Sequence, residues 1–165
     1  MPVSTVLQGG WSQCFSQTYN LAIDDDMDNI VSSCAGLNLM LACRQTNSAT
    51  ISLLAWASRD DVMFQTKDVN PSHIAEGTSW YFDQQSGVCS PRTCSWGFAR
   101  AGDPINRANC DLEGNPDSTG PFRLCWHTAA KPNGGWRCGS STDLDVSSKW
   151  EKLIFHISNI FVLYE

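Results

Sequence analysis

Residues 37–57, LNLMLACRQTNSATISLLAWA, decide the fold that the sequence predicts. Two apolar runs, residues 37–44 and 50–57, are joined by the polar residues 45–48. Apolar runs of this length between turn residues are typical of buried strands, and a short polar connection favours an antiparallel pair. The segment therefore predicts two buried antiparallel strands.

More strands are predicted on both sides of this pair. They are rich in β-branched or aromatic residues and are bounded by turn residues, as strands usually are. The predicted strands cover residues 2–8, 11–19, 80–82, 96–98, 122–127 and 135–138. The last two flank Pro132-Asn133-Gly134, a hairpin signal. The sequence predicts a mainly β fold, a sandwich or another β-rich arrangement, in one domain over residues 1–165.

One short helix is predicted near residues 26–35. Its apolar residues recur at i, i+3, i+4 and i+7: Met27, Ile30, Val31 and Cys34. Acidic residues precede this pattern and Gly36 follows it, which are start and stop signals of a helix. Calcium binding by the acidic run is the alternative. An EF-hand loop counted from Asp24 would need glycine and glutamate where Asn29 and Ala35 stand, so the helix is favoured.

Eight cysteines are spread over most of the chain, and they predict a disulfide framework. They are Cys14, Cys34, Cys43, Cys89, Cys94, Cys110, Cys125 and Cys138. No Cys-x-x-Cys occurs and the three histidines lack metalloprotease spacing, so metal binding and free thiols are weaker interpretations and no metal site is predicted. Cys89–Cys94 is expected as a local bridge. Cys125–Cys138 is expected across the hairpin, although an Asn-Gly turn centre would require a bulge or a longer loop.

Disulfides form in oxidising compartments, so an extracellular or cell-surface location is expected. No basic residue precedes Arg44 and no long apolar run follows Met1, so the sequence shows no leader peptide. Two explanations stay open: a leader was removed, or the start reflects how the chain was defined.

The charge and the composition of the chain exclude some classes of binding partner. The net charge is −6 and only 17% of the residues are charged. Binding to nucleic acid or to anionic membranes requires clustered Lys and Arg, so neither partner is expected. Seven tryptophans permit a large aromatic core and also sugar recognition. No cofactor is predicted.

The C-terminal stretch, residues 150–164, is apolar on both faces of a strand, which indicates burial on both faces. It is too short and too polar for a membrane span. A central strand of the domain is the simpler interpretation. The alternative is that the terminal strands 2–8 and 152–164 contact other subunits by strand addition. The candidate assembly strand consists of Leu153, Phe155, Ile157, Ile160, Phe161 and Leu163.

Several motifs together resemble an uncharacterised Cys/Trp-rich module of secreted or surface-anchored microbial proteins. They include GWSQC at 10–14, LMLACR at 39–44, SWGFARAGD at 95–103, RLCWHT at 123–128 and GGWRCG at 134–139. The likeness spans roughly residues 10–155 and implies secretion without any assigned chemistry. Cys89, Cys94 and the apolar tail after His156 look like additions to the module.

No catalytic residue is predicted. A cysteine protease would need a free Cys14 with His127 as its base, but an even set of cysteines predicts that Cys14 is bridged. A glycosidase needs two carboxylates across a cleft, and nothing in the sequence brings two together. The acids considered are Asp60, Asp61, Glu76, Asp83 and Asp103. Residues 59–61 are more simply a structural ion-pair turn.

Two non-enzymatic functions are predicted, with a secreted hydrolase third. The first is a structural subunit of an extracellular fibril, appendage or matrix that assembles with copies of itself through its terminal strands. The second is a monomeric lectin-like adhesion module that binds glycans. Its candidate site combines aromatic and polar residues: Trp80, Tyr81, Trp96, Arg100 and Asp103.

Overall fold

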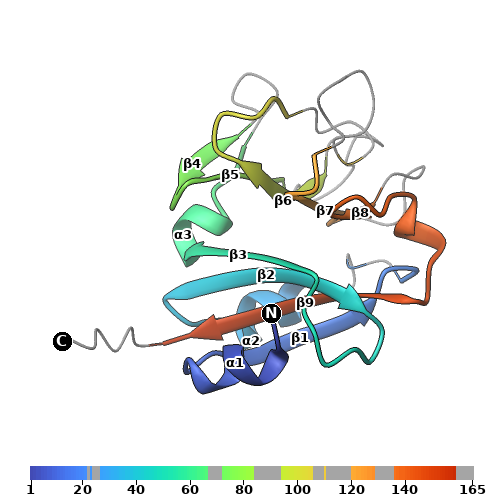
Figure 1. Ribbon diagram of the computed structural model, residues 1–165. Helices are drawn as coiled ribbons and strands as arrows, with labels where there is room; N and C mark the ends of the chain where they lie inside the picture. Colours follow the sequence, from blue (N-terminus) through green and yellow to red (C-terminus); the bar gives the residue numbers. More distant parts are fainter. Residues whose placement is uncertain are drawn as a thin grey trace.

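The computed structural model describes residues 1–21, 23, 27–66, 72–83, 94–105, 110, 120–128 and 136–158. Two antiparallel sheets lie one above the other (Figure 1). The first has the order β1-β9-β2-β3, from Ser12–Thr18, Trp150–Ile157, Asn38–Gln45 and Leu53–Ser58. The second has the order β4-β5-β6-β7-β8, from His73–Ala75, Thr78–Phe82, Ser95–Arg100, Arg123–His127 and Arg137–Cys138. The predicted β-rich class is confirmed.

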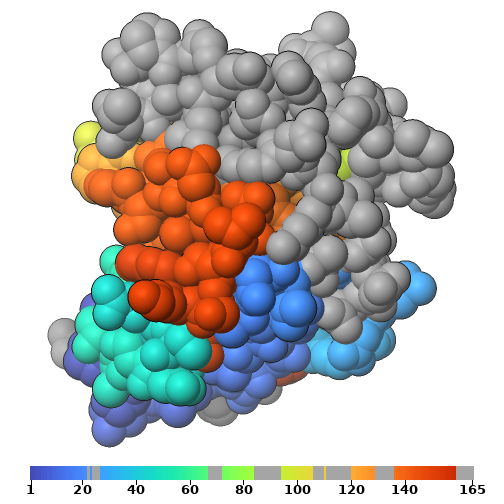
Figure 2. Space-filling model, turned by 90° about the vertical axis from the view of Figure 1, so that its right-hand side faces the viewer, coloured from blue at the N-terminus to red at the C-terminus, as the bar shows by residue number. Residues whose placement is uncertain are grey.

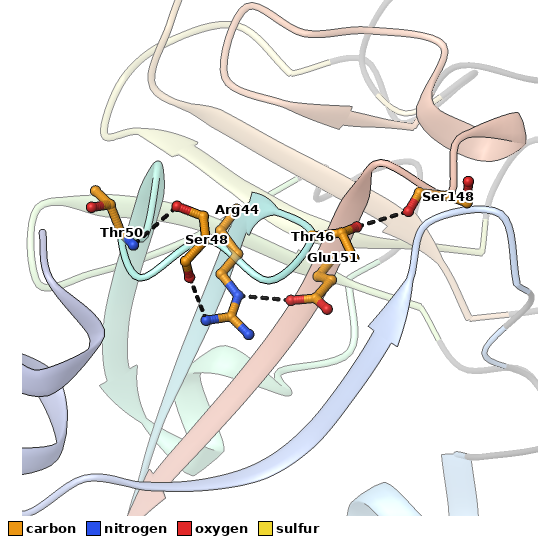
Figure 3. Close-up of polar contacts among 6 residues, drawn as sticks. All are labelled: Arg44, Thr46, Ser48, Thr50, Ser148 and Glu151. Carbon is orange, nitrogen blue, oxygen red and sulfur yellow. Dashed lines mark hydrogen bonds and ion pairs between the residues drawn. The ribbon is translucent and has the colours of Figure 1, made fainter.

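The stretch that decides the fold forms β2 and β3, which pair as predicted, with Leu41 opposite Ala55. β2 is interior to the sheet, since β9 pairs with its other side. The turn between β2 and β3 is held by polar contacts (Figure 3). The Arg44 guanidinium forms an ion pair with Glu151 on β9 at 2.7 Å and donates to the Ser48 carbonyl. Thr46 donates through its hydroxyl to the Ser148 carbonyl.

β9 is a central strand, which confirms the simpler interpretation of the C-terminal stretch. It pairs with β1 on one side and with β2 on the other. Ile154 packs in the core between the sheets, whereas Leu153 and Phe155 pack on the opposite face of the first sheet. The expectation that Leu153, Phe155 and Ile157 form an assembly strand is wrong, because both edges of β9 are already paired within the chain. Its other members, Ile160, Phe161 and Leu163, lie outside the described residues.

The predicted N-terminal strand is wrong: Val3–Gln8 forms the helix α1. The β-branched residues Val3, Thr5 and Val6 favour a strand by residue type, whereas the spacing of Val3 and Val6 places both on one face of a helix, and tertiary packing decides. Val6 is buried against Met40, Leu153 and Phe155, so α1 covers the outer face of the first sheet. The other helices are α2 (Met27–Ser33), which confirms the predicted helix, and α3 (Arg59–Val62).

Four fully buried tryptophans dominate the core between the sheets: Trp80, Trp96, Trp126 and Trp136. The register of β5, β6 and β7 brings Phe82, Trp96 and Trp126 onto one face, with ring centroids 5.0 and 6.1 Å apart. Tyr19, at the end of β1, meets Trp126 edge-on at 6.2 Å. These ring contacts join the two sheets through their facing surfaces.

The structure corrects the predicted cysteine pairing. Cys125 bonds to Cys110, and Cys138 bonds to Cys43 on β2, so the Cys125–Cys138 prediction is wrong. Leu124 lies opposite Cys138, so Cys138 and the next residue of β7, Cys125, point to opposite faces of the sheet. Cys14 bonds to Cys34. Cys94 is disulfide-bonded, but the predicted partner, Cys89, lies outside the described residues.

The Cys43–Cys138 disulfide joins the two sheets near the contact between the β2–β3 turn and the segment that follows β8. Figure 2 shows orange residues after β8 against the cyan residues of the β2–β3 turn. There the Thr46 N–H donates to the Lys149 carbonyl at 2.9 Å. The disulfide and this hydrogen bond hold the segment between β8 and β9 to the first sheet.

Gly97 is required by a close approach in the middle of the second sheet. The Tyr81 ring crosses over Gly97, and its hydroxyl donates to the Leu124 carbonyl at 3.1 Å. A methyl group at Gly97 would overlap the Leu124 carbonyl oxygen and lie 2.7 Å from the Tyr81 hydroxyl. We expect Gly97→Ala to lower the free energy of unfolding by about 2 kcal/mol. Urea unfolding measures the loss, and Gly120→Ala, where the nearest described atom, Arg123 Nε, is 4.0 Å away, is the matched control. Equal losses in both variants would contradict this account.

Candidate functional site

The predicted glycan site does not exist as a surface. Trp80, Tyr81 and Trp96 are completely buried, so none of them can stack on a sugar ring, and that prediction is wrong. Each donates to a backbone carbonyl instead; Trp96, for example, donates to Val62 at 3.2 Å. Alternation along β5 and β6 sends the tryptophans toward the other sheet. Arg100 is exposed at the end of β6, and Asp103 is half-buried.

The acids considered for a glycosidase do not gather. Asp60 and Glu76 are exposed, Asp83 is buried, and Asp61 and Asp103 are half-buried. Among the described residues no group of three or more His, Cys, Asp or Glu side chains is placed to hold a metal ion. The described part of the chain also contains no helix long and apolar enough to cross a bilayer. Cys14 is bridged to Cys34, so it is no thiol nucleophile.

A serine, an aspartate and a histidine do meet on the surface, next to α3. His73 Nε2 lies 2.7 Å from Asp61 Oδ1, and the Ser58 hydroxyl donates to Asp61 Oδ2 at 2.6 Å. In a hydrolytic triad the imidazole lies between serine and carboxylate. Here the carboxylate lies in the middle, and Ser58 also accepts from the Asp61 N–H as the helix cap. The cluster therefore fastens α3 to β4, and this arrangement does not activate Ser58.

These hydrogen bonds hold the pKa of Asp61 below its usual range, through Ser58 first and His73 second. We expect Asp61→Asn to lower the free energy of unfolding by about 1 kcal/mol at neutral pH. Because the folded-state pKa is lowered, this difference is present above the ordinary carboxyl pKa and disappears as the pH falls through the lowered value. Urea unfolding of the wild type and the variant, at neutral pH and at a pH below the lowered pKa of Asp61, measures the difference in the free energy of unfolding. Asp60→Asn, at the exposed neighbour, is the control, and an equal loss there would refute the assignment.

Lys152 is a second unusual polar group, because its side chain is completely buried. Its ammonium donates to the Leu21 carbonyl at 2.6 Å and lies 4.6 Å from the centre of the Trp136 ring. A carbonyl and an aromatic face both stabilise a buried cation. Lys152 therefore acts in the packing of β9 against the aromatic core.

The first sheet has an open edge at β3. In an antiparallel pair, backbone groups alternately face the neighbouring strand and face away from it. The Arg59 N–H donates to the Leu37 carbonyl, and Leu39 lies opposite Ala57. This phase points the backbone groups of Ala55 and Ala57 toward β2, and those of Leu54, Trp56 and Ser58 away from it. In the described part of the chain, no strand pairs with this side of β3.

The open stretch has defined ends. At one end residues Met1 and Val3 occupy the edge, where Met1 exchanges hydrogen bonds with Ile51. At the other end Ser58 caps α3, so its carbonyl belongs to the first turn of that helix. The N–H and C=O of Leu54 and Trp56 and the N–H of Ser58 therefore have no partner among the described residues.

The side chains of this edge are apolar and uncharged. No charged residue occurs from position 45 to 58. Trp56 is 40% exposed and its ring lies 5.9 Å from that of Trp11. Proteins usually protect an edge strand with charge, proline or a covering segment. Among the described residues no charge, proline or strand protects the backbone edge at Leu54 and Trp56, although the Leu54 side chain packs in the cluster that contains Val6. Farther along the chain, Phe64 and Ile74 are also exposed, with Phe64 stacked on His73 at 4.2 Å.

No protein-family model, curated protein or solved structure matches the chain. The resemblance to a secreted Cys/Trp-rich module therefore stays a prediction.

The sequence did not identify the β3 edge, because an apolar strand that is buried on one face looks the same whether its neighbour is present or absent. One signal was available: the run from residue 45 to 58 lacks any charge that would protect an edge.

Proposed function

We propose that this chain is a non-enzymatic extracellular interaction domain that binds a protein partner by strand addition to β3. The observation that carries the proposal is the uncharged β3 edge, where no described residue pairs with the outward backbone groups of Leu54 and Trp56. Strand addition uses such groups for affinity and the alternate side chains for specificity. The disulfides support the extracellular location, since they persist in oxidising compartments.

This proposal moves the predicted assembly surface from the terminal strand to β3. β9 has neighbours on both sides, and the N-terminal segment is helical from Val3 to Gln8. A structural subunit of a fibril or matrix is compatible with an open edge, because one strand of each neighbour can extend the sheet.

The test uses random extended peptides displayed on phage and selected on the immobilised full chain. Selected peptides are expected to slow hydrogen exchange at the amides of Leu54, Trp56 and Ser58, while those of Ala55 and Ala57 are protected with or without peptide. Leu54→Pro removes an outward N–H and is tolerated, because that N–H is not used in the ladder. Peptides that bind the Leu54→Pro variant as well as the wild type, or that protect other amides, would overturn the proposal.

A glycan-binding role has one supporting observation, the half-exposed Trp56 beside Trp11. Tryptophan faces are suitable platforms for sugar rings. A glycan array probed with wild type and with Trp56→Ala tests it. Binding that the substitution abolishes supports the role, and absence of binding by the wild type excludes it.

A further inference from the structure

We infer that the partner of the β3 edge is a second copy of this chain, paired antiparallel so that Trp56 lies opposite Trp56 of the other copy. This inference rests on the proposed function and specifies its partner. A two-fold axis through the centre of β3 would join two four-stranded sheets into one eight-stranded sheet.

The free backbone groups are arranged for self-pairing. They extend from Leu54 to Ser58, with Trp56 in the middle, and an antiparallel pair brings each of them except the Leu54 N–H opposite its complement. The backbone N–H of each Trp56 donates to the Trp56 carbonyl of the other copy. The N–H of each Ser58 donates to the Leu54 carbonyl of the other copy. Such a register forms about four intermolecular backbone hydrogen bonds.

The ends of the open stretch select this register. The other copy turns into α3 at Arg59, which this register places level with Leu53. The added strand therefore ends before it reaches Ile51, where Met1 already occupies the edge. A register centred on Ala55 would bring Arg59 of the other copy level with Ile51, into the N-terminal segment.

Charge also favours a second copy over a charged peptide. Residues 45–58 are uncharged, so neither an acidic nor a basic strand gains an ion pair along the edge, and no like charges face each other within the paired residues 54–58. The two Trp56 side chains would meet on the outer face, each flanked by its own Trp11 at 5.9 Å. Cross-strand aromatic pairs stabilise such contacts.

The dimer is expected to be weak. Five residues of one strand and a few side chains bury less than a standard interface, so dissociation in the micromolar range or above is expected. Each copy carries a net charge of −6, and this repulsion is screened by salt. As the protein concentration increases, the average mass from light scattering should rise toward that of two chains. Added salt should shift this rise to a lower protein concentration.

Cysteine cross-linking of the folded protein tests the register. In a hydrogen-bonded antiparallel pair the opposing Cα atoms lie about 5.5 Å apart, which a disulfide spans. Trp56→Cys is therefore expected to form a disulfide dimer under mild oxidation. Leu54→Cys is the matched control on the same face, because two copies of residue 54 would lie about 13 Å apart along the strands. A Trp56→Pro variant, which lacks the outward N–H that this register uses twice, should stay monomeric.

The outcomes separate this inference from the proposed function. A wild type that stays monomeric at high concentration, or a Trp56→Cys variant that cross-links no faster than Leu54→Cys, overturns the self-pairing. If selected peptides still protect the amides of Leu54, Trp56 and Ser58, the proposed function stands with a different partner. If neither association nor peptide protection occurs, both fail.

Discussion

Replacing Cys43 and Cys138 together with alanine is expected to lower the free energy of unfolding by about 4.7 kcal/mol. This disulfide closes a loop of 95 residues, and cross-linking a long loop removes the most conformational freedom from the unfolded chain. It also connects the central strand β2 to the edge strand β8, so both sheets lose a covalent connection. Urea unfolding under non-reducing conditions measures the loss.

The matched control is the double replacement of Cys110 and Cys125, whose loop is 15 residues long. The same relation gives about 3 kcal/mol for that loop. All four sulfurs are buried, so their packing losses are similar and the comparison isolates loop length. If the Cys110/Cys125 variant loses as much stability as the Cys43/Cys138 variant, the longer loop between the sheets adds no extra stability.

The second large effect is a loss of stability in mild acid caused by His127. Its side chain is buried in the second sheet, with its ring 6.0 Å from that of Trp136. In the described part of the chain neither ring nitrogen makes a hydrogen bond of good geometry, and the contact with the Cys94 backbone is a weak one. Burial lowers the pKa of His127 to about 4, with the Cys94 backbone acting in the opposite direction.

The direction follows from the protons bound in each state. Above about pH 6.5 the imidazole is neutral in both states and has no effect on stability. Between about 6.5 and 4 the unfolded chain binds a proton that the folded chain does not, so stability falls with pH. The full loss is about 3 kcal/mol and is complete below the folded-state pKa.

Urea unfolding at several pH values tests this effect against His127→Phe, which keeps an aromatic ring and removes the titrating group. Wild type should lose stability between pH 6.5 and 4, and the variant should lose about 3 kcal/mol less over the same range. The comparison uses the slope with pH, so it stands even if the variant is less stable at every pH. A variant with the wild-type slope would refute the assignment to His127.

Local patterns identified most of the strands and the helix α2. The two apolar runs at residues 37–57 form β2 and β3, and the acidic start with Gly36 at the end bounds α2 as predicted. The prediction failed at α1, because β-branched residues such as Val3 and Val6 favour a strand by residue type, whereas the packing of Val6 on the apolar outer face of the first sheet stabilises the helix.

Local sequence patterns could not predict the open β3 edge, for a different reason. A tryptophan at a strand position has the same neighbours in sequence whether it is buried, like Trp96, or exposed, like Trp56. Which one is accessible depends on the strand order, which places β6 inside one sheet and β3 at the edge of the other.

The sequence by itself determined the β-rich class, the helix α2, the central placement of the C-terminal strand and the use of cysteines in disulfides. Each follows from short-range periodicity, from apolarity on both faces of a strand or from residue type. The tertiary structure alone decided that Cys43 pairs with Cys138, that the N-terminal segment is helical and that β3 is left open. These three features depend on which distant segments of the chain meet. Side-chain alternation predicts that a strand has two faces, but it does not predict which segment covers either face or either edge.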